Sequence, residues 1–249
     1  ISIKPRNGDF VPNLIKQNIK RSLKRYSVAG IVPEILDLKY LFIETSSKVY
    51  YNTNLAPSAS FVSTKVQRDL TAYAESSELN KYGARFKYSR FLKVIDSSHE
   101  SVTSNITTVE MRRDLRLAIS EVAEYAIDFG NEFHIQSMNG FNIRTSAFRV
   151  LNINTDVYLY DTPDSTGEKG QISLFSLDEG SSTPVIQRRN VGVIDYKKGR
   201  ITLDPINIVS GKSKDNVDIL EISATPESND IIGLQDLYLQ LDSSFVDMV

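Results

Sequence analysis

The sequence predicts an α+β fold, in which a small helix-covered α+β layer is followed by an antiparallel β-rich domain. Two observations carry this prediction. Before about residue 96, apolar residues recur at helical spacing in three stretches, and strand-like runs accompany them. From about residue 119, short alternating runs separated by turn residues replace the helical period. We therefore expect an N-terminal amphipathic helix segment (1–32), an α+β domain (33–117) and an antiparallel β-rich domain with an acidic C-terminal tail (118–249).

The first predicted element is a helix over residues 12–27. Pro12 suits the first helical turn, and Gly30 with Pro33 ends the pattern. One apolar stripe runs along this helix, formed by Leu14, Ile15, Ile19, Leu23 and Tyr26.

Residues 35–51 predict the strand around which the chain is organised. The run is rich in aromatic and β-branched residues and contains no Gly or Pro. It is apolar on both faces at one end, interrupted by Asp37 and Lys39, so both faces need cover. Because a typical strand has about 5–6 residues, we expect this run to be bent, bulged or folded into a hairpin near Ser46 and Ser47.

Two helices and a further strand follow. A helix is predicted from the spacing of Val62, Val66, Leu70 and Tyr73, with Ser58 or Ser60 as its N-cap. A second helical pattern covers residues 87–97, and residues 102–115 alternate as a strand. The expected order is helix, strand, helix, helix, strand, with helices covering one face of a short sheet.

The β-rich region contains eight alternating runs, at residues 122–129, 141–153, 157–160, 172–175, 185–188, 191–196, 201–206 and 217–224. Its clearest element is a hairpin over 191–203, with Gly199 at the left-handed position of a three- or four-residue loop. Residues 231–241 also alternate and predict an edge strand, which is open to completion by another chain.

Composition narrows the classes of function. The 249-residue chain is 41% apolar and 24% charged, as is ordinary for a globular protein. It has no Cys, which excludes disulfides, thiolate zinc sites and Cys nucleophiles. No stretch approaches the roughly 20 apolar residues of a membrane-spanning helix. The chain begins at Ile1 without a signal-like segment, so we expect a piece of a longer polypeptide.

The net charge of −2 conceals an asymmetry between the two ends. Residues 215–249 contain eight acidic side chains and no Lys or Arg. Residues 1–30 contain one acid, Asp9, and seven basic residues, namely Lys4, Arg6, Lys16, Lys20, Arg21, Lys24 and Arg25. Either these are two solvated faces, or they attract each other within one chain or head-to-tail between chains. The candidate partner-binding residues are Lys16, Lys20, Arg21, Lys24 and Arg25. Nucleic-acid binding is not expected, because the whole chain is slightly acidic.

Residues that usually carry chemistry are scarce. His99 begins an HExxH-like stretch, but Thr103 stands where the second zinc ligand belongs. His134 has no second His or Cys near it in sequence and is expected in a strand. Asp161 and Asp164 are expected to lie in a loop, where they stabilise turns rather than bind a cation.

The same expectation applies to the cluster Asp215, Asn216 and Asp218. Residues 211–213 (Gly-Lys-Ser) resemble the end of a phosphate-binding loop, but Ile206 replaces its first Gly. We expect no enzyme activity, catalytic residue, cofactor, bound metal or small-molecule substrate.

Several features together resemble a known family. They are Pro33-Glu34, the long strand ending in Val49-Tyr50-Tyr51, the amphipathic helix after it, the start of the next helix at residues 88–92, the 191–203 hairpin and the acidic tail. This succession resembles the baseplate J-like family of contractile-tail phage proteins. The resemblance is greatest to the C-terminal portion of the baseplate wedge subunits of T-even-type bacteriophages.

That resemblance implies a structural virion protein of the tail baseplate, assembled in the host cytoplasm. It also implies a homodimer that links neighbouring wedges into a ring and contacts other wedge proteins, with no nucleic acid and no membrane as partner. The family supplies no catalytic residues. One alternative is a β-rich receptor- or glycan-binding module, which an exposed aromatic cluster within residues 141–206 would favour. A second is a hydrolase, which two carboxylates converging on His99 or His134 in a cleft would favour.

Overall fold

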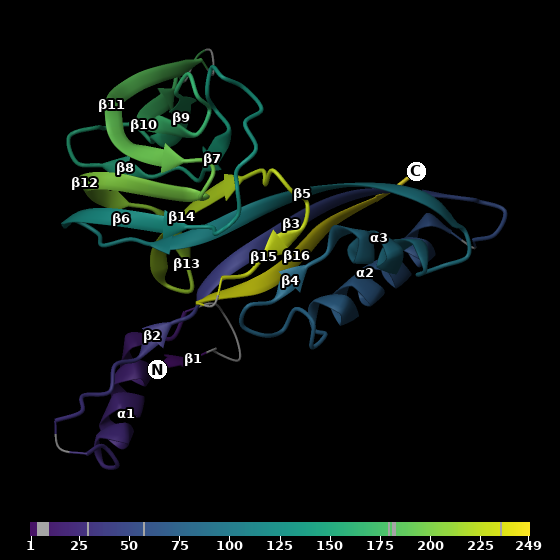
Figure 1. Cartoon of the computed structure of the whole chain (residues 1–249), viewed down its shortest axis with the longest axis horizontal. Helices are drawn as coiled ribbons and strands as arrows, with labels where there is room; N and C mark the ends of the chain where they lie inside the picture. Colours follow the sequence, from purple (N-terminus) through teal and green to yellow (C-terminus); the bar gives the residue numbers. More distant parts are fainter. Residues whose placement is uncertain (4–9, 29, 57, 179, 181–182, 235) are drawn as a thin grey trace.

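The structure, a computed structural model, describes residues 1–3, 10–28, 30–56, 58–178, 180, 183–234 and 236–249. It has a β-rich α+β fold, as the sequence predicts, with two large sheets and few helices (Figure 1). Its three described helices are α1 (Asn13–Lys24), α2 (Ala59–Ala74) and α3 (Tyr88–Asp96).

One large sheet forms an elongated arm, which extends to the point where the described chain ends (Figure 1). Its order is β13 (Lys212–Lys214), β14 (Val217–Ala224), β5 (Val102–Arg116), β3 (Lys39–Tyr51) and β16 (Leu237–Met248), while β7 (Ile143–Thr145) also pairs with β14. The pairs are antiparallel except that β16 runs parallel to β3. The C-terminal strand therefore lies at the edge of this sheet, beside the strand that the sequence singles out.

The stretch 35–51 is not a hairpin. It forms the short strand β2 (Leu36–Asp37) and then the continuous strand β3, with no reversal at Ser46 or Ser47. Both of its faces are covered, as its composition requires: Leu41 belongs to the main core, and Phe42 to a separate small cluster on the other face.

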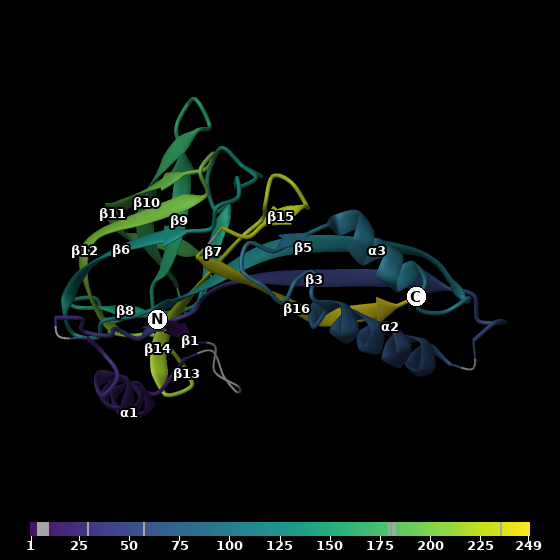
Figure 2. The same ribbon diagram turned by 60° about the horizontal axis from the view of Figure 1, so that its bottom comes forward.

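Helices α2 and α3 cover one face of the arm (Figures 1 and 2). Helix α2 begins where predicted, because Ser58 is its N-cap and its Oγ accepts a hydrogen bond from the Phe61 N–H at 3.2 Å. The apolar stripe of Val62, Val66, Leu70 and Tyr73 is buried, as its spacing predicts. Beside these helices, the short strand β4 (Arg85–Phe86) pairs with β15 (Ile231–Ile232).

The second large sheet is antiparallel throughout. Its order is β6 (Val122–Asp128), β12 (Arg200–Ser210), β11 (Pro184–Asp195), β10 (Lys169–Leu177) and β9 (Tyr158–Pro163), with β8 (Arg149–Val150) also on β12. The predicted hairpin joins β11 to β12, and Gly199 has φ +62° in its loop. Runs predicted separately at 185–188 and 191–196 form the single strand β11, whereas 141–153 yields only the short strands β7 and β8.

The two sheets share one contiguous apolar core, which extends along the chain from Leu41 to Leu239. Strand β14 pairs with β5 and β16 pairs with β3, so the range 118–249 contributes strands to the arm. The division of the chain at residue 117 remains a proposal. Helix α1 and the small pair of β1 (Ser2–Ile3) with β2 are set apart from both sheets (Figures 1 and 2).

Candidate functional site

Helix α1 exposes the apolar stripe that its sequence predicts. None of its residues is fully buried, although Ile19 and Leu23 are half-buried. Leu14 is 68% exposed and Ile15 48%, and Tyr26, just beyond the helix, is 87% exposed. An amphipathic helix in a globular domain normally buries such a stripe against a core. In the described part of the chain, this helix covers its stripe only in part.

Asp37 anchors the base of α1 to the rest of the molecule. Its Oδ1 accepts a hydrogen bond from the Val11 N–H at 3.1 Å, and its Oδ2 lies 2.5 Å from Lys16 Nζ. Arg116 Nη1, from β5, lies 3.3 Å from the same Oδ2. One carboxylate thus links the helix, β2 and the arm. The sequence shows Asp37 only as a charge interrupting an apolar strand, and it gives no sign of these partners.

The five candidate partner-binding residues therefore separate into two groups. Lys16 is mostly buried, and Asp37 neutralises it, so it is not a free partner-binding cation in this chain. Lys20, Arg21, Lys24 and Arg25 are exposed and have no ion pair among the residues that the structure describes. Lys4 and Arg6, which the sequence adds to the basic end, lie outside those residues.

Two of the exposed cations border a hollow of about 360 Å³. Lys20 and Lys24 line one side, and Val28, Ile31 and Val32 line the other. These three apolar residues are 72%, 63% and 75% exposed. The result is a surface that combines positive charge with exposed apolar area, which is the composition expected of a binding surface. We call α1 with residues 26–33 the α1 surface.

The acidic end of the chain has partners of its own. Asp236 Oδ2 lies 3.1 Å from Lys39 Nζ, and Asp230 Oδ1 accepts a hydrogen bond from the Tyr88 N–H at 2.7 Å. No ion pair between this end and α1 occurs in the described parts of the chain. Attraction between the two ends within one chain is therefore not observed, and attraction between chains remains a prediction.

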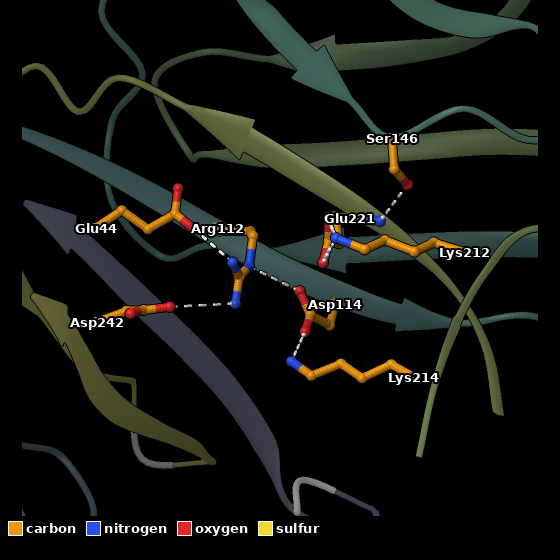
Figure 3. A network of polar contacts seen from close by, with 8 residues as sticks. All are labelled: Glu44, Arg112, Asp114, Ser146, Lys212, Lys214, Glu221 and Asp242. Carbon is orange, nitrogen blue, oxygen red and sulfur yellow. Dashed lines mark hydrogen bonds and ion pairs between the residues drawn. The ribbon is translucent and has the colours of Figure 1, made fainter. Parts of the chain in front are cut away.

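A polar network is centred on Arg112 and Glu44 of the arm (Figure 3). It lies on the same face as Phe42, opposite the face on which Leu41 packs with α2 and α3. At its centre, Arg112 Nη1 lies 2.5 Å from Glu44 and Nε lies 3.0 Å from Asp114, while Nη2 lies 3.8 Å from Asp242. The guanidinium also lies 4.4 Å from the centroid of the Phe42 ring. A single side chain of β5 thereby contacts β3 and β16.

Burial alone lowers the pKa of Arg112, but the Asp114 and Glu44 carboxylates outweigh burial and raise it. Glu44 shows the opposite balance. Burial raises its pKa, and this effect exceeds the attraction of Arg112.

The network continues into β14, which pairs with β5, and into β13 beyond it. Asp114 Oδ2 lies 2.7 Å from Lys214 Nζ, and Glu221 Oε2 lies 2.8 Å from Lys212 Nζ (Figure 3). The Glu221 N–H donates a hydrogen bond of 3.1 Å to the Ser146 hydroxyl. The Glu221–Ser146 hydrogen bond joins the arm to the connection that follows β7, and the two ion pairs link β5, β13 and β14 to one another. Together these contacts are suited to keeping these segments in a fixed arrangement.

Each histidine has a nearby polar partner, and His134 lies outside the strands, contrary to the expectation. His99 Nδ1 lies 2.7 Å from the Ser101 hydroxyl, and its ring contacts Phe61 edge-on. His134 Nδ1 lies 2.7 Å from Glu227, and both side chains are about half exposed. No group of His, Cys, Asp and Glu suitable for a metal ion occurs among the described residues.

Asp161 differs from the turn-forming residue that the sequence suggests. It lies in β9 rather than in a loop, and it is fully buried. Its Oδ1 accepts hydrogen bonds from the Asn142 N–H at 2.8 Å and the Ile143 N–H at 3.0 Å. Its Oδ2 accepts from Asn142 Nδ2 at 2.7 Å and from the Tyr196 hydroxyl at 2.5 Å. Asp161 is thus a structural acceptor.

Asp164, Asp215 and Asn216 lie in turns, as expected, whereas Asp218 lies in β14 rather than in a loop. Asp164 Oδ1 accepts hydrogen bonds from the Thr166 hydroxyl and N–H and the Gly167 N–H, and the Thr166 hydroxyl contributes most to lowering the pKa of Asp164. Asp215 and Asn216 both have positive φ and form the two-residue turn between β13 and β14. In the described part of the chain, no helix combines the length and apolar character needed to cross a membrane.

Comparison with known proteins gives this geometry a context. Residues 1–36, which contain α1, match the family model "Baseplate structural protein gp6, C-terminal domain I". Residues 39–114, which contain β3, α2, α3 and most of β5, match "Baseplate structural protein gp6, C-terminal domain III".

A curated relative is baseplate wedge protein gp6 of Enterobacteria phage T4, which is 29% identical over 167 residues. The alignment covers 65% of this chain, but the chain spans only about a quarter of the length of that relative. None of these three matches names the baseplate J-like family, so that part of the resemblance stays a prediction. The chain is therefore similar to the C-terminal portion of a gp6-type baseplate wedge protein.

Proposed function

We propose that this chain is a structural component of the baseplate wedge in a contractile phage tail. Its similarity to two C-terminal gp6 domain models and to the T4 relative supports this role. The chain locates to the virion, in the tail baseplate, and is assembled in the host cytoplasm. It acts through contacts rather than through catalysis.

Within that role, the chain associates with a second copy of itself, links neighbouring wedges into a ring and contacts other wedge proteins. The observation that carries this proposal is the α1 surface. Exposed apolar residues lie there beside four exposed cations that have no ion pair among the described residues. An acidic partner with an apolar patch can remove that apolar area from water and pair those charges.

The acidic C-terminal region supplies a complementary surface on a second copy. Strand β16 lies at the edge of its sheet, and its outer side bears one described bridge, from Tyr238 to Tyr82. Asp247 on this strand is exposed and has no ion pair among the described residues. A two-fold dimer allows the α1 surface of each copy to meet the acidic region of the other.

Analytical ultracentrifugation tests this arrangement. We expect the chain to form dimers at tens of micromolar and to dissociate as salt is raised, because exposed charges are screened. Reversing two cations, in the double variant Lys20→Glu/Lys24→Glu, is expected to weaken the dimer at least about tenfold.

The matched control is Lys197→Glu/Lys198→Glu in the β11–β12 hairpin loop. Both lysines are similarly exposed, and the change in charge is the same. The control dimer is expected to dissociate as the unmodified protein does. A chain that remains monomeric at every concentration rejects self-association, and an affinity independent of salt rejects the electrostatic part.

A further inference from the structure

The outer face of the second sheet carries a hollow that the proposed wedge role does not use. Its volume is about 620 Å³, within the range typical of small-molecule sites. The residues lining it come from four adjacent strands, β9 to β12, and they include Thr162, Gln171, Asn190 and Thr202. Alternation puts Thr162, Gln171 and Thr202 on the face opposite the core-facing Ile172 and Leu203.

A bulge in β11 accounts for the hollow. Between two neighbouring paired positions, β10 has the single residue Ser173, whereas β11 has three residues, 189–191. Asn190 has φ +55°, and its N–H donates a hydrogen bond to the Ser173 hydroxyl at 3.3 Å. A bulge redirects side chains out of the regular strand, so Arg189 and Asn190 line the hollow.

Some of the charged side chains that line the hollow form ion pairs, and others do not. Arg200 pairs with Asp128, and Asp195 lies 3.8 Å from Lys198. Lys169 and Arg189 are exposed and have no ion pair in the parts of the chain that the structure describes. Amide and hydroxyl groups line the hollow beside these two cations, together with the carboxylates of Asp164 and Asp195, and Asp195 is the cross-strand partner of Lys169.

An aromatic cluster continues the same face of the sheet. Ser173, which lines the hollow, is the cross-strand partner of Tyr160. The Phe141 ring stacks on Tyr160, with centroids 5.0 Å apart and planes 18° from parallel. Phe175 contacts both rings edge-on. Phe141 is 48% exposed, so the ring that covers Tyr160 is itself open to solvent.

The backbone of Phe141 is held in an unfavourable conformation. Its φ is +63°, in the left-handed region that bulky side chains rarely adopt. Asn142 and Ile143, which follow it, are fixed by the buried Asp161. The fold therefore maintains strain that holds a phenyl ring at the surface, a combination that occurs preferentially at binding sites.

The geometry points to a saccharide-binding site on the outer face of β9–β12, for an oligosaccharide that carries carboxylate or phosphate groups. An exposed aromatic ring offers the apolar face on which a sugar ring stacks. The amide and hydroxyl groups of Gln171, Asn190 and Thr202 suit sugar hydroxyls, and Lys169 with Arg189 suits the anionic group. This site is independent of the proposed wedge contacts.

Isothermal titration calorimetry on the full chain tests the site with three probes at millimolar concentration. They are tetragalacturonate, the neutral maltotetraose, and a tetraglutamate peptide. We expect binding of tetragalacturonate, weak or no binding of maltotetraose, and no binding of the peptide. Phe141→Gly is expected to weaken tetragalacturonate binding about tenfold or more, while Phe141→Tyr, which keeps an aromatic ring, retains it.

Two controls separate binding from folding. Glycine accepts the positive φ of position 141, so Phe141→Gly is expected to leave the unfolding temperature within about 3 °C of the unmodified protein. Arg189→Ala is expected to weaken binding, whereas Arg188→Ala, on the same strand outside the lining, is not.

Absence of saccharide binding overturns the proposal, as does saccharide binding that survives both Phe141→Gly and Arg189→Ala. Binding of the peptide alone overturns it in favour of a polypeptide-docking face. Equal binding of the neutral and acidic saccharides overturns the role assigned to the two cations.

Discussion

Replacing Asp161 by alanine is expected to destabilise the protein more than replacing any of its surface acids. Four hydrogen bonds end on this carboxylate, from donors on Asn142, Ile143 and Tyr196. Those three residues are at most 7% exposed, so their donors lose their acceptor without gaining bulk water. Each buried donor left unpaired costs about 1–3 kcal/mol. A water molecule entering the vacated space recovers part of this, which leaves a net loss of about 3–5 kcal/mol.

Urea unfolding followed by tyrosine fluorescence measures this loss, since the chain contains 12 Tyr and no Trp. Asp156→Ala is the control, because Asp156 is 53% exposed and, among the described residues, forms an ion pair with Arg149 alone; it is expected to cost less than about 1 kcal/mol. Tyr196→Phe alone is expected to cost about 1–2 kcal/mol, and little in the Asp161→Ala background. Strict additivity of the two changes, or a loss below about 1 kcal/mol for Asp161→Ala, refutes the network as described.

Two further predictions concern buried charges in the arm. Burial lowers the pKa of Arg113 from its ordinary value to about 10, and its Nε has no partner among the described residues. Arg113→Met is therefore expected to leave the free energy of unfolding unchanged or to raise it by about 1–3 kcal/mol at neutral pH. Above about pH 10 the unfolded state binds more protons at this site than the folded state, so the unmodified protein gains stability relative to the variant as the pH rises past 10, and urea midpoints measured on both sides of pH 10 will show this. Burial raises the pKa of Glu44 above 4.5, so its contribution to stability is complete below pH 4.5 and is lost as the pH rises through the raised value. Glu44→Gln imitates the protonated form, so we expect it to be more stable than the unmodified protein at neutral pH; urea midpoints that rank the two proteins in the opposite order contradict this reasoning.

Local patterns in the sequence predict the elements well where one physical cause dominates. The 3.6-residue spacing of Val62, Val66 and Leu70 gives α2, and the Ser58 cap gives its start. The left-handed Gly199 gives the hairpin. Each of these depends on interactions between residues close in sequence.

The features that sequence reasoning missed depend on distant residues. Asp161 reads as a turn former, because nothing local indicates that Tyr196 will bring a hydroxyl to it. The bulge that opens the hollow depends on how β11 pairs with β10, and no local signal marks the insertion. Lys16 reads as a free cation for the same reason, since Asp37 lies 21 residues further along the chain.

The parallel pairing of β16 with β3 has a consequence for synthesis. Strand β3 is synthesised nearly two hundred residues before β16, the strand with which it pairs. Until β16 has left the ribosome, one edge of β3 has no strand to pair with, and the apolar residues of β3 and α2 that β16 covers stay partly exposed to water. Closing so wide a loop is entropically slow, which makes the nascent arm vulnerable to aggregation and gives an early-binding assembly partner or chaperone a window in which to act.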